Sequence, residues 1–214
     1  CTSFGSFLYI FHLKDVQGLN FVSLTFDNFV LINLFYQTNE TIFMAKKIKL
    51  NQCEIQKMFQ FFSSKNSKTN KIDSILYEGS FEEIDFDKRF DICVSNPPFY
   101  HNDVIKSDNE CLKIARYNDS LPLEVFIKKT STILNSEGKF FFCYDVKQIN
   151  EILILLNKYK FNLEALQFVH PKDSKDATLI LVYAKKNSKS LTKILKPLIV
   201  LDKNNEFTSE VQEI

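Results

Sequence analysis

Short apolar segments alternate with longer amphipathic segments from Lys46 onward. The apolar segments predict strands at 48–54, 72–77, 90–95, 139–145, 163–169 and 177–185. The amphipathic segments predict helices at 56–66, 121–134 and 147–160. Strands that alternate with helices are typical of an α/β domain with a mostly parallel sheet. The last two strands have no helix between them, so we expect them to pair as a hairpin whose final strand is antiparallel.

The predicted strand at 90–95 runs directly into Asn96-Pro97-Pro98-Phe99, a sequence that suits a planar substrate carrying an NH2 group. The side-chain oxygen of Asn96 and the backbone carbonyl of Pro97 can accept its hydrogens, and the Phe99 ring can stack on its plane. Proline fixes φ and lacks an N–H, so these carbonyls point in fixed directions. Two prolines after a strand are also an ordinary stop signal, because proline cannot continue a central strand. We interpret the full combination as a substrate site.

This tetrapeptide resembles motif IV, (N/D/S)PP(Y/F/W), of the class I S-adenosylmethionine-dependent amino-methyltransferases. From about residue 48 to 190 the chain is similar to one branch, the bacterial valine-tRNA adenine-37 N6-methyltransferases. The matching segments are 53–56, 95–100, 115–117, and 169–172 running into 177–182. Other adenine and glutamine methyltransferases share motif IV, so the His-Pro-Lys segment before an apolar strand narrows the choice. The resemblance implies a Rossmann-like sheet and S-adenosyl-L-methionine as cofactor.

The resemblance places cofactor-binding residues at the ends of successive strands. Ligands of open α/β sheets bind at the carboxyl ends of the strands, where the Glu54 carboxylate can accept both ribose hydroxyls. The alternative for Glu54 is an acid favoured by the dipole at a helix N-terminus. Ser80 stands where the family often has an acid that holds the adenine amine, which is a departure from the pattern. The resemblance also implies that Phe81 covers the adenine and that Asn96 contributes to the cofactor site.

The beginning of the chain departs from the family. Class I methyltransferases have a glycine-rich turn after the first strand, which lets the backbone approach the cofactor. This chain has four glycines, none in a G-x-G pair, and none at 19–45. Either the first part of the sequence is altered, for example by a frameshift, or the protein has lost the loop; the abrupt return of family-like sequence at Lys46 favours the first. We therefore predict an atypical segment at 1–45 and a methyltransferase domain at 46–214.

Composition bears on whether the protein spans a membrane, is secreted or holds a structural metal. The apolar content of 45% is enough for a core, and the absence of a run of about 18 apolar residues predicts no membrane span. The chain begins Cys-Thr-Ser without a leader pattern, so we expect no signal peptide and a fragment whose true start is missing. Five widely spaced cysteines without a C-x-x-C pair or Cys/His cluster predict a reduced, cytoplasmic protein without a structural metal. We expect a monomer.

Candidate RNA contacts lie outside the central motif. The net charge is only +1, but lysines gather at 65–71, 172–175 and 185–196. Such patches can bind phosphates, although a solvated lysine surface is the alternative. His170 and Lys172, in the loop predicted before the final strand, are RNA-facing candidates.

The polar segment 101–119 also suits a substrate loop. The Arg116 guanidinium can clamp a phosphate or stack on a base, and an ion pair with Asp108 or Glu110 is the alternative. Tyr100 is a second aromatic candidate at the site, or a core residue.

The resemblance implies methylation of an adenine N6 in tRNA, after the base leaves its stack and enters the site. Hydrogen bonds from the amine to Asn96 and Pro97 would orient the nitrogen lone pair, and orientation is the main contribution. One alternative is a protein-glutamine or ribosomal-RNA amino-methyltransferase that uses the same residues. Another is a non-catalytic RNA-binding protein with the methyltransferase fold. The missing glycine turn supports that second alternative, whereas the presence of Glu54 and of the full motif argues against it.

Overall fold

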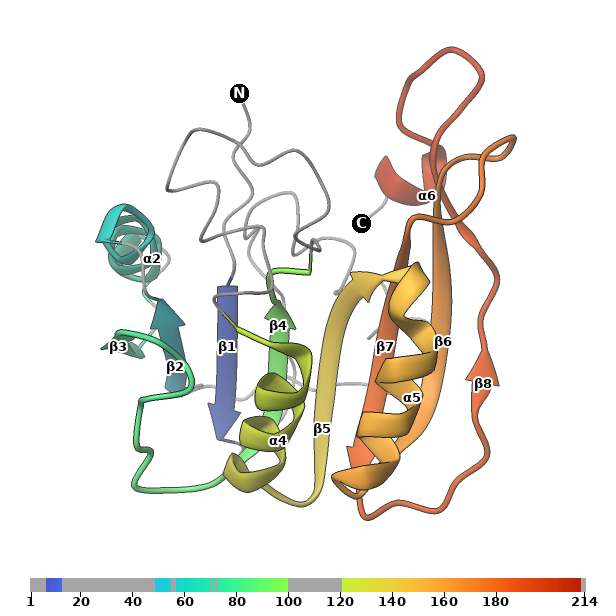
Figure 1. Cartoon of the computed structure of the whole chain (residues 1–214). Coiled ribbons are helices and arrows are strands. Elements are labelled where there is room, and N and C mark those ends of the chain that lie inside the picture. Colours follow the sequence, from blue (N-terminus) through green and yellow to red (C-terminus); the bar gives the residue numbers. More distant parts are fainter. Residues whose placement is uncertain are drawn as a thin grey trace.

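The computed structural model describes residues 7–12, 49–54, 57–69, 71, 73–99 and 121–212 (Figure 1). Within them, a nine-stranded sheet has the order β3-β2-β1-β4-β5-β7-β6-β8, and β9 pairs with β6. The strands are β1 (Phe7–His12), β2 (Lys49–Glu54), β3 (Asp73–Glu78), β4 (Phe90–Asn96), β5 (Leu134–Asp145), β6 (Phe161–Lys172), β7 (Leu179–Lys186), β8 (Lys193–Ile194) and β9 (Leu198–Leu201).

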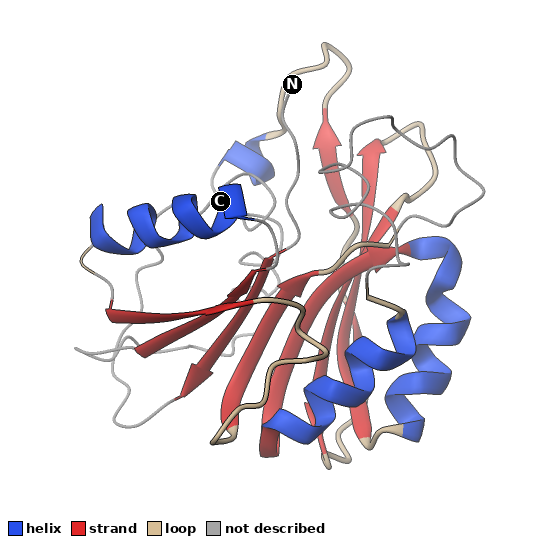
Figure 2. Ribbon diagram, turned by 60° about the vertical axis from the view of Figure 1, so that its left-hand side comes forward, coloured by secondary structure: helices blue, strands red, loops and turns tan. Residues whose placement is uncertain are grey.

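Helices cover the sheet unevenly. The helices are α2 (Lys57–Thr69), α4 (Leu123–Ile133), the short 3-10 helix η2 (Val146–Gln148), α5 (Ile149–Lys158) and α6 (Ser209–Gln212). Figure 2 shows α4 and α5 side by side on one face of the sheet. Helix α2 packs beside β2 and β3.

The strand directions confirm the predicted α/β class. Strand β2 is parallel to β3, and β4 is parallel to β5. Strand β7 is antiparallel to both β5 and β6, as predicted for the hairpin formed by the last two long strands. Beyond it, the short strands β8 and β9 add to β6 in the parallel sense.

Strand β1 is a feature that the sequence analysis did not assign. It lies between β2 and β4 and runs antiparallel to both (Figure 1). Its sequence, Phe-Leu-Tyr-Ile-Phe-His, is rich in the aromatic and β-branched residues that favour strands. A six-residue apolar segment cannot be assigned by periodicity alone. Within the described residues, β1 and β7 are therefore antiparallel to the remaining strands.

Strand β5 begins earlier than predicted. The sequence predicted a helix to residue 134 and a turn at Gly138, whereas the structure ends α4 at Ile133 and starts the strand at Leu134. The pairing with β4 shifts register between Phe90 and Ile92, whose partners are Leu134 and Lys139. Gly138 lies in this bulge. The bulge favours glycine, because a Cβ at this position would lie 2.9 Å from the Asn135 carbonyl oxygen. The predicted turn is thus an irregular start of the strand.

Strand β6 extends further than predicted and corrects the placement of two candidate residues. His170 pairs with Ile199 and Lys172 with Leu201 in the parallel ladder to β9. Both residues therefore end a strand instead of lying in the predicted loop, and the turn follows them at 173–175. This extension could not be predicted from the sequence, because the strand that pairs with it is a separate, later one.

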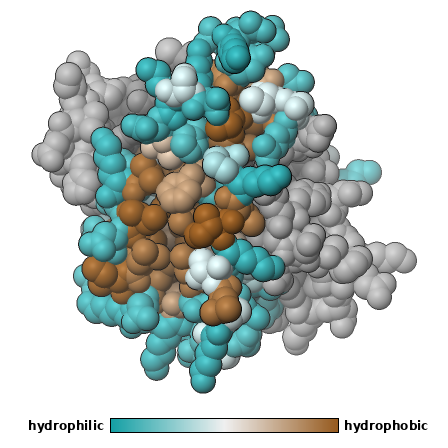
Figure 3. All heavy atoms as spheres, turned by 90° about the vertical axis from the view of Figure 1, so that its right-hand side faces the viewer, coloured by the Kyte–Doolittle hydropathy of each residue, from teal (hydrophilic) through white to brown (hydrophobic). Residues whose placement is uncertain are grey.

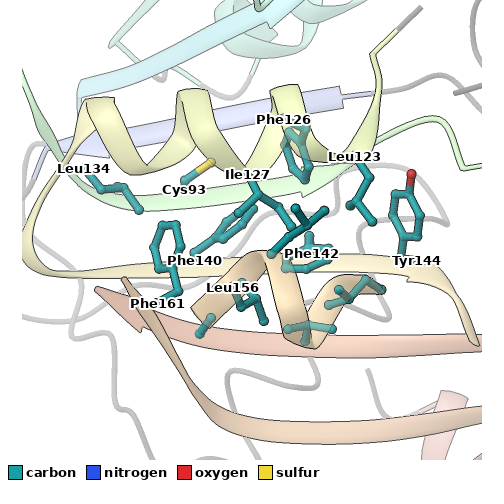
Figure 4. Close-up of a cluster of buried hydrophobic side chains, with 14 of the residues drawn as sticks. Cys93, Leu123, Phe126, Ile127, Leu134, Phe140, Phe142, Tyr144, Leu156 and Phe161 are labelled. Atoms are coloured by element: carbon teal, nitrogen blue, oxygen red, sulfur yellow. The ribbon is translucent and has the colours of Figure 1, made fainter. Parts of the chain in front are cut away.

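Aromatic rings fill the space between the sheet and its two neighbouring helices (Figure 4). Phe140 and Phe142 are fully buried neighbours on one face of β5, with stacked rings 4.6 Å apart. The Phe126 ring of α4 meets both, at 5.2 and 5.8 Å. Cys93 of β4 lies in the same cluster, so this layer joins β4, β5 and α4 in one core.

Apolar side chains also reach the surface on the side that carries β6 and β8 (Figure 3). The large hydrophobic residues exposed in the C-terminal half are Leu153, Ile154, Leu191, Ile194 and Phe207. Among the candidate residues from the sequence, His170 and Lys172 belong to β6, whereas Glu54 and Asn96 end β2 and β4.

The Phe142→Ala variant is expected to lower the free energy of unfolding by about 3–5 kcal/mol, because it removes a fully buried ring and leaves a cavity. Urea unfolding followed by circular dichroism measures the change. Phe61→Ala is the matched control: this ring on α2 is 62% exposed, so its loss should change stability by no more than about 0.5 kcal/mol. Equal losses for the two variants would contradict the described core.

Candidate functional site at the carboxyl edge of the sheet

The carboxyl ends of the parallel strands gather polar residues at one edge of the sheet. Strands β2, β3, β4 and β5 run in the same direction (Figure 1). Their last residues are Glu54, Glu78, Asn96 and Asp145. This is the edge at which open α/β sheets bind ligands. The sequence prediction that Glu54 and Asn96 end strands of one sheet is therefore confirmed.

The Asn-Pro-Pro-Phe motif directly follows the buried strand β4, as predicted. Cys93, Val94 and Ser95 are buried, which holds the end of the strand rigidly in the sheet. Pro97 and Pro98 are buried as well, whereas Asn96 and Phe99 are half-buried. The two functional side chains of the motif thus stay partly accessible while the prolines between them are enclosed.

The neighbouring strand β5 and the helix η2 contact both ends of the motif. The Cys143 thiol donates a hydrogen bond to Oδ1 of Asn96, with 2.8 Å between sulfur and oxygen. The Phe99 ring packs against Tyr144, with 5.7 Å between centroids and 55° between planes. Nε2 of Gln148 donates to the Phe99 carbonyl oxygen at 3.0 Å.

None of these three contacting residues was predicted from the sequence as part of the site. Residue order alone could have suggested them, because 139–145 is the next predicted strand after the motif and adjacent strand ends meet at one edge. What the sequence lacks is the register, which pairs Ser95 with Phe142 and so sets Asn96 beside Cys143.

Glu54 is a buried carboxylate at the end of β2, with 3% of its surface exposed. Its backbone carbonyl accepts hydrogen bonds from the Gly79 N–H at 3.2 Å and from Nε2 of Gln60 at 2.8 Å. These bonds tie the end of β2 to the turn after β3 and to helix α2. Gly79 has a φ of +132°, a conformation that side chains rarely adopt. The backbone around the carboxylate is therefore fixed from two sides.

Burial also acts on the thiol that precedes this carboxylate. Desolvation, and then the charge of Glu54, raise the pKa of the Cys53 thiol to about 12. The thiol donates to the Gly79 carbonyl oxygen, 3.6 Å from the sulfur. Cys53 is therefore a protonated, structural residue.

The turn after β3 carries the two residues assigned to the adenine. Ser80 begins the turn, and its carbonyl oxygen accepts the N–H groups of Glu83 and Ile84 at 3.0 and 3.2 Å. The Phe81 ring lies in the core, 5% exposed and 6.2 Å from the rings of both Phe86 and Phe126. An adenine contact by Ser80 or Phe81 stays a prediction.

The end of β6 lies close to the segment that contacts the motif. The Val146 N–H of η2 donates to the Thr178 carbonyl, and the Thr178 N–H donates to the Val169 carbonyl, at 3.3 and 3.0 Å. His170 Nδ1 is 2.8 Å from the Lys175 carbonyl oxygen, and the Lys172 ammonium donates to Oδ1 of Asn205. The structure thus brings the β6–β7 connection beside η2.

Several predicted residues lie outside the described part of the chain. They are Tyr100, Arg116, the whole segment 101–119 and the segment 19–45 in which a glycine-rich turn was sought. Among the described residues, no group of three or more side chains suited to a metal ion occurs. No helix described in the structure has the length and hydropathy needed to cross a membrane.

Curated relatives bear the name that the sequence resemblance suggested. The tRNA1(Val) (adenine(37)-N6)-methyltransferase of Pedobacter heparinus is 27% identical over 89 residues, which are 42% of this chain and 38% of the relative. A protein of the same name from Porphyromonas gingivalis is 26% identical over 106 residues, or 50% of this chain and 41% of the relative. Each match thus spans less than half of the relative's length. No protein-family model matches the chain.

Solved structures of methyltransferases share the fold. A predicted O-methyltransferase from Agrobacterium tumefaciens superposes with a TM-score of 0.54 at 19% identity, over 75% of this chain and 74% of that one. The M protein of the type I restriction enzyme EcoKI gives a TM-score of 0.53 at 14% identity, over 75% of this chain and 38% of its own. The predicted methyltransferase fold and the predicted family resemblance are therefore confirmed.

The raised pKa of Cys53 predicts a specific loss of stability in alkali. Its ordinary value is 9.0 and its folded value about 12, so the protonated thiol stabilises the fold fully below pH 9 and loses that contribution as the pH rises toward 12. Urea unfolding at a series of pH values measures this. Cys53→Ala should lose less free energy of unfolding across this window than the wild type. An equally steep loss in both proteins would contradict a buried, protonated Cys53.

Proposed function

We propose that this chain is an S-adenosyl-L-methionine-dependent methyltransferase that methylates N6 of an adenine in tRNA. The observation that carries the proposal is the placement of Asn96-Pro97-Pro98-Phe99 at the carboxyl edge of a methyltransferase-like sheet, with Asn96 and Phe99 partly accessible. The names of the curated relatives support tRNA adenine as the substrate over protein glutamine or ribosomal RNA. We place this activity in the domain 46–214 and in the cytoplasm.

The residues at the edge fit the cofactor. A buried carboxylate at the end of β2, Glu54, suits a pair of ribose hydroxyls, because an ionised carboxylate accepts hydrogen bonds and does not donate them. When bound, S-adenosyl-L-methionine supplies an electrophilic methyl group on a sulfonium. Asn96, Ser80 and Phe81 are the further residues that we propose to hold it.

Asn96 and Pro97 orient the nitrogen that is methylated. An amide oxygen has two lone pairs, so Oδ1 of Asn96 can accept one hydrogen bond from the Cys143 thiol and another from a substrate N–H. The Pro97 carbonyl oxygen accepts a hydrogen bond from the second N–H of the amine, in a direction fixed by the proline ring. These two bonds draw the amine toward a tetrahedral shape, and the lone pair then points away from both acceptors. Orientation of this kind is worth up to about 7–11 kcal/mol, and the amine proton can leave to solvent after transfer.

Phe99 holds the plane of the flipped base. Its ring is half-buried against Tyr144, so part of it remains for stacking. Stacking of a base on an aromatic side chain contributes about 1–3 kcal/mol, which offsets part of the few kcal/mol that removal from the stack costs. His170, Lys172, Tyr100 and Arg116 are the residues that we propose to contact the surrounding RNA.

A second candidate is a non-catalytic RNA-binding protein with this fold. Two observations favour it: the sequence has no G-x-G turn, and β1 runs antiparallel to its neighbours. In that case cofactor binding would be lost while tRNA binding would remain.

Calorimetric titration with S-adenosyl-L-methionine tests the cofactor site. Wild type should bind with micromolar affinity, and Glu54→Ala should bind at least about tenfold more weakly, because two charge-assisted hydrogen bonds are removed. Glu206→Ala, which changes an exposed glutamate of the C-terminal segment, should bind as the wild type does. Failure of the wild type to bind would favour the non-catalytic candidate.

Mass spectrometry of nucleosides from purified tRNA tests the reaction. Wild type should form N6-methyladenosine, and Asn96→Ala should reduce the rate about 10²-fold or more, on the scale of losing one preorganised polar group in an active site. Cofactor affinity of Asn96→Ala should change only a few-fold, because Glu54 remains. Methylation of glutamine in a release factor, with none in tRNA, would overturn the proposed substrate.

A further inference from the structure

Two consecutive residues of β5 contact the first and the last residue of the Asn-Pro-Pro-Phe motif. Cys143 donates to the Asn96 side chain, and Tyr144 packs against the Phe99 ring. Successive side chains of a strand point to opposite faces of the sheet. The two contacts therefore hold the motif from both faces at once.

The surroundings of each residue agree with this division between the faces. Tyr144 belongs to the core cluster that also contains Phe140 and Phe142 on the helix-covered face, and Phe99 packs against that cluster. Cys143 lies with Phe141 on the other face, where Phe141 stacks on Tyr183 at 4.4 Å. Asn96 shares the face of Cys143, because the ladder pairs Ser95 with Phe142.

A third contact fixes the backbone at the end of the motif. Gln148 is buried, and its Nε2 donates to the Phe99 carbonyl oxygen at 3.0 Å. The Asp145 carboxylate accepts the Lys147 N–H at 2.9 Å and so caps the η2 turn that presents Gln148. The turn is thus held at its start by Asp145 and joined to the motif at its end.

From these contacts we infer that Cys143, Tyr144 and Gln148 form a positioning element that presets Asn96 and Phe99 for the amine substrate. The inference rests on the proposed function. The Cys143 thiol fixes which way the Asn96 amide faces, because only the oxygen can accept its proton. With the amide held in this orientation, the second lone pair of Oδ1 is directed to the substrate amine. Tyr144 and Gln148 fix the tilt of the Phe99 ring on which the base stacks.

A purely structural role would predict a different outcome from a positioning role. If Cys143 only filled space, its removal would lower the melting temperature and leave kcat unchanged. If it orients Asn96, its removal lowers kcat with little change in cofactor affinity. The lost hydrogen bond then affects the alignment of the amine for methyl transfer and not the binding of the cofactor. The serine variant then restores kcat, since a hydroxyl also donates to the amide oxygen.

Steady-state kinetics on tRNA separate these roles. Cys143→Ala should lower kcat about three- to tenfold, the scale of one neutral hydrogen bond, and Cys143→Ser should recover most of it. Cys93→Ala is the matched control: Cys93 is a buried cysteine of β4 on the opposite face and in the helix-covered core, so its kcat should equal that of the wild type. Wild-type kcat in Cys143→Ala, or no recovery in Cys143→Ser, would overturn the role of Cys143.

The glutamine contact has its own matched pair. Gln148→Met should lower kcat/KM about three- to tenfold, because it keeps the side-chain length and loses the donor to Phe99. Gln167→Met removes an equal bond, from a buried glutamine to the Lys196 carbonyl oxygen at 3.0 Å, and should leave kcat/KM unchanged. Equal effects of the two substitutions would overturn the role of Gln148.

Nuclear magnetic resonance tests the geometry without any activity. The side-chain NH2 signals of Asn96, identified by their loss in Asn96→Asp, should shift in Cys143→Ala and return toward wild type in Cys143→Ser. Unchanged signals in Cys143→Ala would overturn the inference even in an active enzyme. If the wild type methylates no tRNA, the proposed function fails, while these signals still decide whether Cys143 orients Asn96.

Discussion

The parallel pairing of β4 with β5 is the interaction on which the rest of the structure depends. It joins the strand that ends in the motif to the strand whose end contacts that motif. The same pairing aligns Cys93 with Phe140 on the face covered by α4, so the aromatic core and the candidate site share one register. A change in this register would move Asn96 away from Cys143 and disturb the core at the same time. Stability and site geometry are therefore coupled through a single ladder.

The carboxyl edge itself shows how a buried sheet can present polar groups. Glu54 is enclosed, while its carbonyl is bonded to Gly79 and Gln60. These two bonds to its backbone hold the end of β2, and with it the carboxylate, at the edge of the sheet. Beside it, β1 reverses the direction expected for the first strand of a doubly wound sheet. Phe7, at the start of β1, therefore pairs with Asn96, and His12 ends β1 at the opposite edge of the sheet.

Much of the fold could be predicted because its strands carry strong local signals. The apolar run before Asn96, the hairpin of β6 and β7 and the amphipathic helices α4 and α5 all follow from residue pattern. The direction of β1 could not be predicted, since pairing partners far apart in the chain decide it. The same holds for Cys143 and Gln148, whose importance arises from register. The burial of the Phe81 ring against Phe86 and Phe126 could not be predicted either, because these contacts join residues of separate elements.

The bulge at the start of β5 has a consequence for insertions and deletions. Between the pairs Phe90–Leu134 and Ile92–Lys139, β5 has the four residues 135–138 where β4 has only Asp91. Because this stretch already departs from regular pairing, an extra residue there would leave the register after Lys139 unchanged. One inserted between Lys139 and Cys143 would turn every following side chain to the other face. Natural length variation in this strand should therefore be confined to the segment before Lys139, and a single-residue insertion scan across 134–143 would reveal a sharp boundary in tolerance.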